Sequence, residues 1–194
     1  MKIEAPRNVL LLLIAGILSS CAPSPSKGYL DLAQAHAKPS LDMYNARLGI
    51  LPLRSYPESI GSVISVTIGN ELRDMGIEIT ETAAMVRILR EQNISPRTVT
   101  KVSDYQMIGM VCNVDYLLVG NVVVTTYFKE YVRTGLVSVD FVRTTAQIVD
   151  TTTGEVVLSA IVQRPPKKKW HQSDIIGQAL AAAIRKELTK HSQP

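Results

Sequence analysis

Hydrophobic residues in the first half of the chain are spaced as expected for alternating strands and helices. The apolar run from Leu48 to Leu53 is typical of a short buried strand. The sequence Ser-Tyr-Pro-Glu from Ser55 to Glu58 resembles a capping box and predicts a helix that ends at Gly76. One face of this helix is apolar and would consist of Ile60, Val63, Ile64, Ile68, Leu72 and Met75.

Two more helices are predicted between residues 77 and 114. Residues 77–80 are β-rich and short, and Thr80 is suited to cap the helix that follows. A second capping box from Ser103 to Gln106 opens a brief helix that Asn113 ends. The residues expected to face inward from these two helices are Ala84, Ile88, Leu89, Ile108 and Val111.

The second half of the chain has three long β-rich segments, which are residues 116–128, 132–149 and 155–163. The turn at residues 150–154 predicts that the last two strands form an antiparallel hairpin. Ser173 then caps a closing helix with a single apolar stripe. We therefore expect an α/β (α+β) fold, with a mixed sheet, a C-terminal antiparallel run of three strands and about four flanking helices.

The first 20 residues have the layout of a secretory signal. Lys2 and Arg7 precede an apolar run from Val9 to Leu18, and Ser19 and Ser20 follow it. The apolar run is ten residues long, whereas a membrane-spanning helix needs about 20 residues. We expect this segment to be removed from the mature protein.

The sequence Leu-Ser-Ser-Cys from Leu18 to Cys21 resembles the lipobox of bacterial lipoproteins. The resemblance implies a diacylglyceryl group on the Cys21 thiol and a third fatty acyl chain, such as palmitate, on its freed amine. Two or more acyl chains are sufficient for stable membrane anchoring. Ala22 stands where an Asp would retain an enterobacterial lipoprotein in the inner membrane, so the resemblance implies an outer-membrane anchor on the periplasmic face. The alternative is an ordinary secretory signal with an incidental cysteine, which the complete lipobox disfavours.

Residues 21–45 comprise the lipidated cysteine and a segment rich in Pro, Ser, Ala and Lys. This composition is typical of a flexible tether, although a short helix from Tyr29 to His36 is an alternative for part of it. The folded part would then be a single periplasmic domain from residue 46 to residue 190, a length that fits one hydrophobic core.

The cysteine content argues against an internal disulfide, and the net charge does not indicate a nucleic-acid partner. Cys21 is expected to be a thioether, so Cys112 has no partner for an internal disulfide. Cys112 lies in an apolar stretch, where a buried and inert thiol is the usual case. The formal net charge of +4 is too small to indicate a nucleic-acid partner, and the predicted compartment excludes one.

Several segments resemble the curli-secretion (CsgG-like) lipoprotein superfamily. They are Ile-Leu-Pro-Leu at 50–53, Val-Asp-Tyr-Leu-Leu-Val-Gly at 114–120, and Val-Asp-Thr-Thr-Thr-Gly-Glu-Val-Val at 149–157. The α/β domain of that superfamily is similar to the TolB N-terminal domain, to lipoprotein activators of penicillin-binding proteins, and to the FlgO-type flagellar lipoprotein. The resemblance covers residues 46–190 and supports the fold more than the function.

One property of the curli channel is not carried over to this chain. That channel inserts long membrane-spanning hairpins, whereas the corresponding strands here lack a sustained lipid-facing alternation. They carry the charged residues Lys129, Glu130, Arg133, Asp140 and Arg143. The resemblance therefore implies a periplasmic assembly or accessory domain that binds another protein.

The sequence offers no convergent group of catalytic or metal-binding residues. The three histidines are assigned to the tether (His36), a loop (His171) and the C-terminal tail (His191), without a Cys or carboxylate at ligand spacing. Asp140 and Asp150 have structural roles available on a strand face and in a turn. We expect no enzyme activity, no metal and no cofactor beyond the covalent lipid on Cys21.

Two basic segments are candidate contact sites. Lys167, Lys168, Lys169 and Trp170 form either a solvated loop or a site for anionic lipid headgroups or an acidic partner. Arg133 and Arg143, interleaved with aromatic residues, form either a protein-binding face or ordinary cross-strand pairs. An edge strand open to β-addition is a further route to a partner.

These expectations converge on a non-catalytic component or assembly factor of a cell-envelope complex that serves secretion, the flagellum or the cell wall. It would act as a homo-oligomer or bound to other envelope proteins. The alternative is a periplasmic small-ligand receptor or hydrolytic enzyme, which would have a deep pocket lined by polar groups.

Overall fold

The computed structural model describes residues 32–38, 41, 43–96, 99, 101–128, 137–163 and 172–191. The described strands are β1 (Ala33–Ala37), β2 (Arg47–Ile50), β3 (Glu78–Thr80), β4 (Tyr116–Phe128), β5 (Val137–Asp150) and β6 (Val156–Gln163). The described helices are α2 (Glu58–Arg73), α3 (Thr82–Glu91), α4 (Val102–Cys112) and α5 (Gln172–His191).

The strands form one six-stranded mixed sheet in the order β1-β6-β5-β4-β2-β3. Strand β2 is parallel to both β3 and β4. The other neighbours are antiparallel, including the consecutive run β4-β5-β6. The predicted fold class is confirmed, including the antiparallel C-terminal run and the flanking helices.

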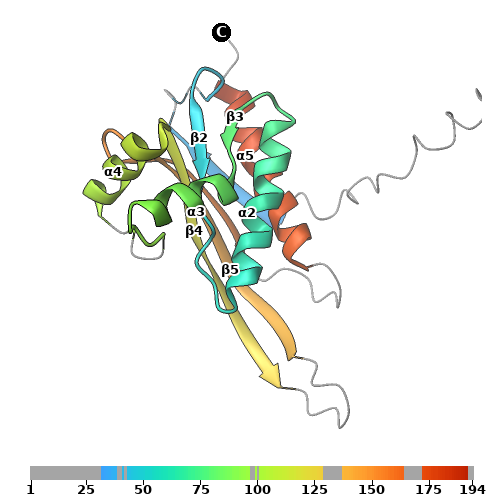
Figure 1. Cartoon of the computed structure of the whole chain (residues 1–194). Coiled ribbons are helices and arrows are strands. Elements are labelled where there is room, and N and C mark those ends of the chain that lie inside the picture. The colour runs from blue at the N-terminus through green and yellow to red at the C-terminus, as the bar shows by residue number, and fades with distance from the viewer. Residues whose placement is uncertain are drawn as a thin grey trace, which may run out of the picture.

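Helices cover both faces of the sheet (Figure 1), and each pair of helices has its own hydrophobic core. Alternate residues of β4 face opposite sides, as strand geometry requires. Leu118 and Val122 pack in the core beneath α2 and α5, whereas Leu117 packs in the core beneath α3 and α4. Because β4 carries apolar residues on both faces, it lies inside the sheet rather than at its edge.

Ser65 fastens α2 to the segment that follows β2. Its hydroxyl accepts a hydrogen bond from the Leu53 amide at 2.9 Å and donates one to the Leu51 carbonyl at 3.1 Å. The Ser65 side chain is fully buried. It therefore pairs backbone groups of a segment that has left the regular ladder.

The predicted helices exist, but their N-terminal caps differ from the sequence prediction. α2 begins at Glu58 after Pro57, and α3 begins at Thr82 after Glu81 rather than after Thr80. The Ser55 hydroxyl does accept a hydrogen bond, from the Gly61 amide at 2.9 Å, without forming the predicted capping box. In α4 the N-cap residue is Lys101, two residues before the predicted cap Ser103. The Asp104 carboxylate accepts a hydrogen bond from the Lys101 amide at 2.9 Å.

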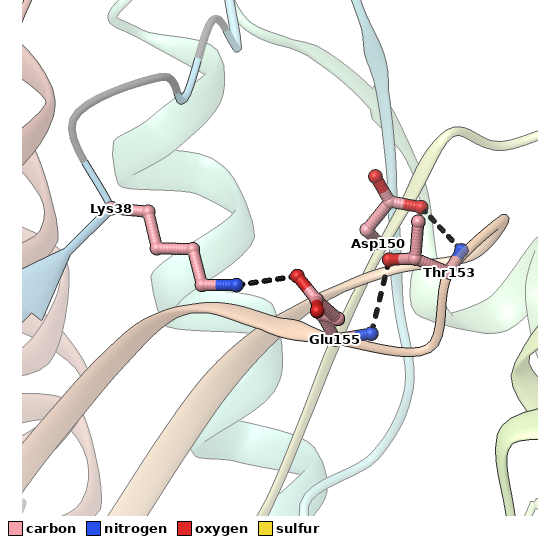
Figure 2. Close-up of polar contacts among 4 residues, drawn as sticks. All are labelled: Lys38, Asp150, Thr153 and Glu155. Carbon is pink, nitrogen blue, oxygen red and sulfur yellow. Dashed lines mark hydrogen bonds and ion pairs between the residues drawn. The ribbon is translucent and has the colours of Figure 1, made fainter.

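The turn between β5 and β6 is built as predicted (Figure 2). One Asp150 carboxylate oxygen accepts the backbone amides of Thr152 at 2.7 Å and Thr153 at 2.9 Å. Gly154 lies in this turn with a φ of +73°, a backbone conformation that favours glycine. An ion pair between Lys38 and Glu155 joins this turn to the end of β1.

Strand β1 corrects the predicted boundary of the tether. Residues 33–37 were assigned to a flexible tether, or in part to a short helix, but they pair with β6 from Ala33↔Val162 to Ala37↔Leu158. Ala35 is buried against the core that α5 covers. The described fold therefore starts before residue 46, and His36 lies exposed on a strand rather than in a tether.

Candidate protein-binding surfaces

Most of the predicted contact residues lie outside the described residues. Cys21, Ala22, Arg133 and the segment 167–170 belong to this group, so their predicted roles stay predictions. Arg143 is described and lies exposed on β5, paired across the sheet with Val123 and Gln163. The structure therefore does not bring the predicted basic residues together into one described site.

Cys112 occupies the environment that the sequence predicted. Its thiol is free and buried in the core beneath α3 and α4. Burial disfavours the thiolate and raises the Cys112 pKa above its ordinary value of 9.0. A buried thiol with a raised pKa is a poor nucleophile.

Strands β4 and β5 extend as a long hairpin beyond the helices (Figure 1). They contain 13 and 14 residues, whereas β2 contains four. The register shifts between Val123↔Arg143 and Val124↔Phe141, which leaves Val142 as an extra residue. Val123 and Val142 are 43% and 42% exposed at this bulge.

The outward side of α4 carries large apolar side chains. Met107, Met110 and Val111 are 39%, 80% and 38% exposed, and Val102 at the start of the helix is 48% exposed. The inward side of the same helix buries Ile108, Gly109 and Cys112. We call the exposed set Val102, Met107, Met110 and Val111 the α4 apolar surface. The sequence analysis placed Val111 on the inward face, and the structure corrects this.

Gly109 sets how closely α4 approaches the turn after β5. A Cβ atom at Gly109 would lie 2.4 Å from the Thr151 Cβ atom, so only glycine fits. The Thr151 hydroxyl in turn donates to the carbonyls of Val114 and Asp115. The turn and the end of α4 are thus closely packed and joined by hydrogen bonds.

A groove of about 710 Å³ runs between β1 and α5. Its walls include Ala33 and Ala35 of β1 together with Ala182 and Arg185 of α5. A smaller groove of about 150 Å³ lies between α2 and the start of α3. In the described part of the chain, no three His, Cys, Asp or Glu side chains are grouped as metal ligands require. Of the helices that are described, none combines the length and apolar character needed to span a bilayer.

Comparison of the sequence with protein-family models gives no match, and comparison with curated proteins gives none either. The fold has distant similarities among solved structures. The PelC dodecamer from Paraburkholderia phytofirmans is 19% identical with a TM-score of 0.45, covering 84% of this chain and 97% of that chain. Lipoprotein GNA1162 from Neisseria meningitidis is 11% identical with a TM-score of 0.48, covering 73% and 96%. The LpoB C-terminal domain from Escherichia coli is 15% identical with a TM-score of 0.39, covering 61% and 83%.

These similarities carry no conclusion about the function of this chain, because the identities are low and the TM-scores are below 0.5. Membership of the curli-secretion superfamily therefore stays a prediction.

Sequence reasoning missed the α4 apolar surface. The sequence does contain an indication of this surface, because the apolar residues of α4 are spread around the helix and are not confined to one stripe. The packing of α4 against the core decides which of these apolar residues are buried and which stay exposed.

Proposed function

We propose that this protein is a lipid-anchored, non-catalytic component or assembly factor of a bacterial cell-envelope complex. It binds another envelope protein through the α4 apolar surface. The observation that carries the proposal is Met110, which is 80% exposed on a helix whose opposite side is already buried in the core. An uncovered cluster of large apolar side chains on a soluble domain favours a protein-binding site.

The chemistry of the surface suits a protein partner. Full burial of a methionine or valine side chain contributes about 1.5–3 kcal/mol, and Met110 has most of its area still available. Methionine is unbranched and polarizable, so Met107 and Met110 can adapt to the shape of an apolar partner surface. Close packing at Gly109 holds the α4 backbone against the turn, so little backbone ordering is needed when a partner binds.

The lipobox at residues 18–21 supports the anchored location in this proposal. Acylation of Cys21 would hold the chain at the outer membrane with the domain in the periplasm. Twelve peptide units link Cys21 to Ala33, the first residue of β1. Fully extended, they reach at most about 43 Å. The domain would therefore stay close to the membrane, where other envelope proteins are concentrated.

Site-specific photo-crosslinking in intact cells tests the partner site. A photoreactive amino acid replaces Met110 in one full-length variant and Val66 in another. Val66 is the matched control because it is 49% exposed on α2, on the other side of the sheet. We expect a defined cross-linked envelope protein from position 110 and not from position 66. A Met107→Glu substitution should abolish that product, because it places a charge within the apolar contact.

Two results would count against the proposal. The first is an identical pattern of products from positions 110 and 66, which would mean collision rather than binding. The second is an absence of products together with turnover of a substrate by the purified full-length protein. That second result would favour the alternative of a periplasmic enzyme.

A further inference from the structure

The two edges of the sheet differ in how they are protected against pairing. Edge strand β3 is three residues long and begins with Glu78, whose charge and the short length of the strand both discourage strand addition. Edge strand β1 is five residues long and has the sequence Ala-Gln-Ala-His-Ala. It contains no lysine, proline or carboxylate, and among the described residues no strand pairs with its outer side.

The register of β1 identifies which backbone groups face outward. The Lys38 amide donates to the Val157 carbonyl at 2.8 Å, so residues 38 and 157 form a hydrogen-bonded pair. Antiparallel ladders alternate between hydrogen-bonded and non-hydrogen-bonded pairs. Gln34 and His36 therefore bond to β6 as well. The amides and carbonyls of Ala33, Ala35 and Ala37 point away from β6, toward the free edge.

From this geometry we infer that β1 pairs antiparallel with β1 of a second copy of the chain, about a two-fold axis at Ala35. This inference goes beyond the proposed function, because it concerns a second copy at the β1 edge rather than a partner at the α4 apolar surface; only the membrane anchoring is shared with that proposal. The axis pairs Ala35 with Ala35 and Ala33 with Ala37 of the second copy, so all three outward residues meet their counterparts. A shift of two residues along the strand would leave outward groups unpaired at both ends. The two sheets would join into one.

The groove beside β1 favours a second copy over a strongly charged partner. Its α5 wall carries Arg185 and Lys186, and its lining also includes the acidic residues Glu71 and Glu187. A surface with both signs of charge can pair its opposite charges with those of a second copy, whereas a strongly acidic or basic partner would meet like charges.

Membrane anchoring would promote this pairing. Five residues of strand pairing form a small contact, which is expected to be weak between free molecules. Copies held at one membrane within about 43 Å of their anchors have a much higher effective concentration. The paired state is therefore expected in the membrane rather than in dilute solution.

Cysteine cross-linking of the full-length protein in membranes tests the register directly. In the inferred pairing, Gln34 lies opposite His36 of the second copy in a non-hydrogen-bonded pair, where Cα atoms are about 4.5 Å apart and a disulfide can form. The Gln34→Cys/His36→Cys variant should become a dimer of twice the chain mass on mild oxidation. The single variants Gln34→Cys and His36→Cys are the matched controls, and they should form at most a tenth as much dimer.

A charge series provides a second readout at the same two exposed positions. Gln34→Glu/His36→Glu places carboxylates opposite one another and should lower dimer formation in membranes, measured by energy transfer between labelled full-length copies, at least fivefold. Gln34→Glu/His36→Lys places opposite charges together and should restore it. Circular dichroism should show the same fold in all variants.

Three outcomes would overturn the inference. They are no dimer from the double cysteine variant, equal cross-linking in the single variants, or a cross-linked product that contains a different protein in place of the second copy. None of them affects photo-crosslinking from Met110, so failure of this inference is distinguishable from failure of the proposed function.

Discussion

Replacement of Ser65 by alanine should destabilise the domain by removing a buried bridge between α2 and the segment after β2. The Ser65 hydroxyl makes two hydrogen bonds, one with the Leu53 amide and one with the Leu51 carbonyl. Ser65 and Leu53 are 0% and 1% exposed, so water cannot replace the lost hydroxyl without rearrangement. The Ser65→Ala variant therefore leaves backbone groups buried and unpaired.

The expected loss follows from the two hydrogen bonds. Each contributes about 1 kcal/mol net, and an unsatisfied buried donor costs about 1–3 kcal/mol. Alanine is the better helix former and returns about 0.5 kcal/mol in α2. We therefore expect the free energy of unfolding to fall by about 2 kcal/mol. For a domain of this size that corresponds to a decrease in melting temperature of about 4–8 °C.

Urea unfolding and thermal melting followed by circular dichroism measure the change. Ser62→Ala is the matched control, because Ser62 lies on the same helix and its hydroxyl donates only to the Glu58 carbonyl at 3.3 Å. Its effect should stay within about 0.5 kcal/mol. If Ser65→Ala were no less stable than Ser62→Ala, the bridging role of Ser65 would be refuted.

Four further predictions concern other sites. Thr144→Val should raise the free energy of unfolding by about 1 kcal/mol in urea titrations, because Thr144 Oγ1 is buried without a hydrogen-bond partner in the described structure; a loss of stability would contradict this. Gly109→Ala should lower the melting temperature, since its Cβ atom would overlap Thr151, and an unchanged melting curve would show that α4 can shift. Folding raises the Cys112 pKa, because burial disfavours the thiolate. The stability that this thiol contributes is fully present below pH 9 and is lost as the pH rises through the pKa of the folded state. The free energy of unfolding should therefore fall more steeply above pH 9 in the wild type than in Cys112→Ala. Cys21→Ala should leave the domain folded but move it from the membrane fraction to the soluble fraction, and continued sedimentation with membranes would argue against lipid anchoring.

The turn between β5 and β6 was predicted correctly from local sequence patterns, whereas the exposed face of α4 was not. Asp150 and Gly154 form the predicted turn because both residues act on backbone within a few positions of themselves. The predicted helix caps were less accurate, since Ser55 bonds to Gly61 rather than closing a capping box. The sequence predicted basic segments as candidate contact sites, whereas the α4 apolar surface was identified only in the structure.

Hydrophobic periodicity in the sequence determined α2, the three strands β4–β6 and α5, because each is long enough to bury a continuous apolar face. Tertiary structure alone decided the place of β1. Alanine contributes little hydrophobic signal, so Ala-Gln-Ala-His-Ala does not resemble a strand until β6 supplies backbone partners and α5 covers Ala35. The same holds for Met110, whose exposure depends on which side of α4 meets the sheet. Local patterns fix elements, but the pairing of distant segments decides which edges and faces remain open.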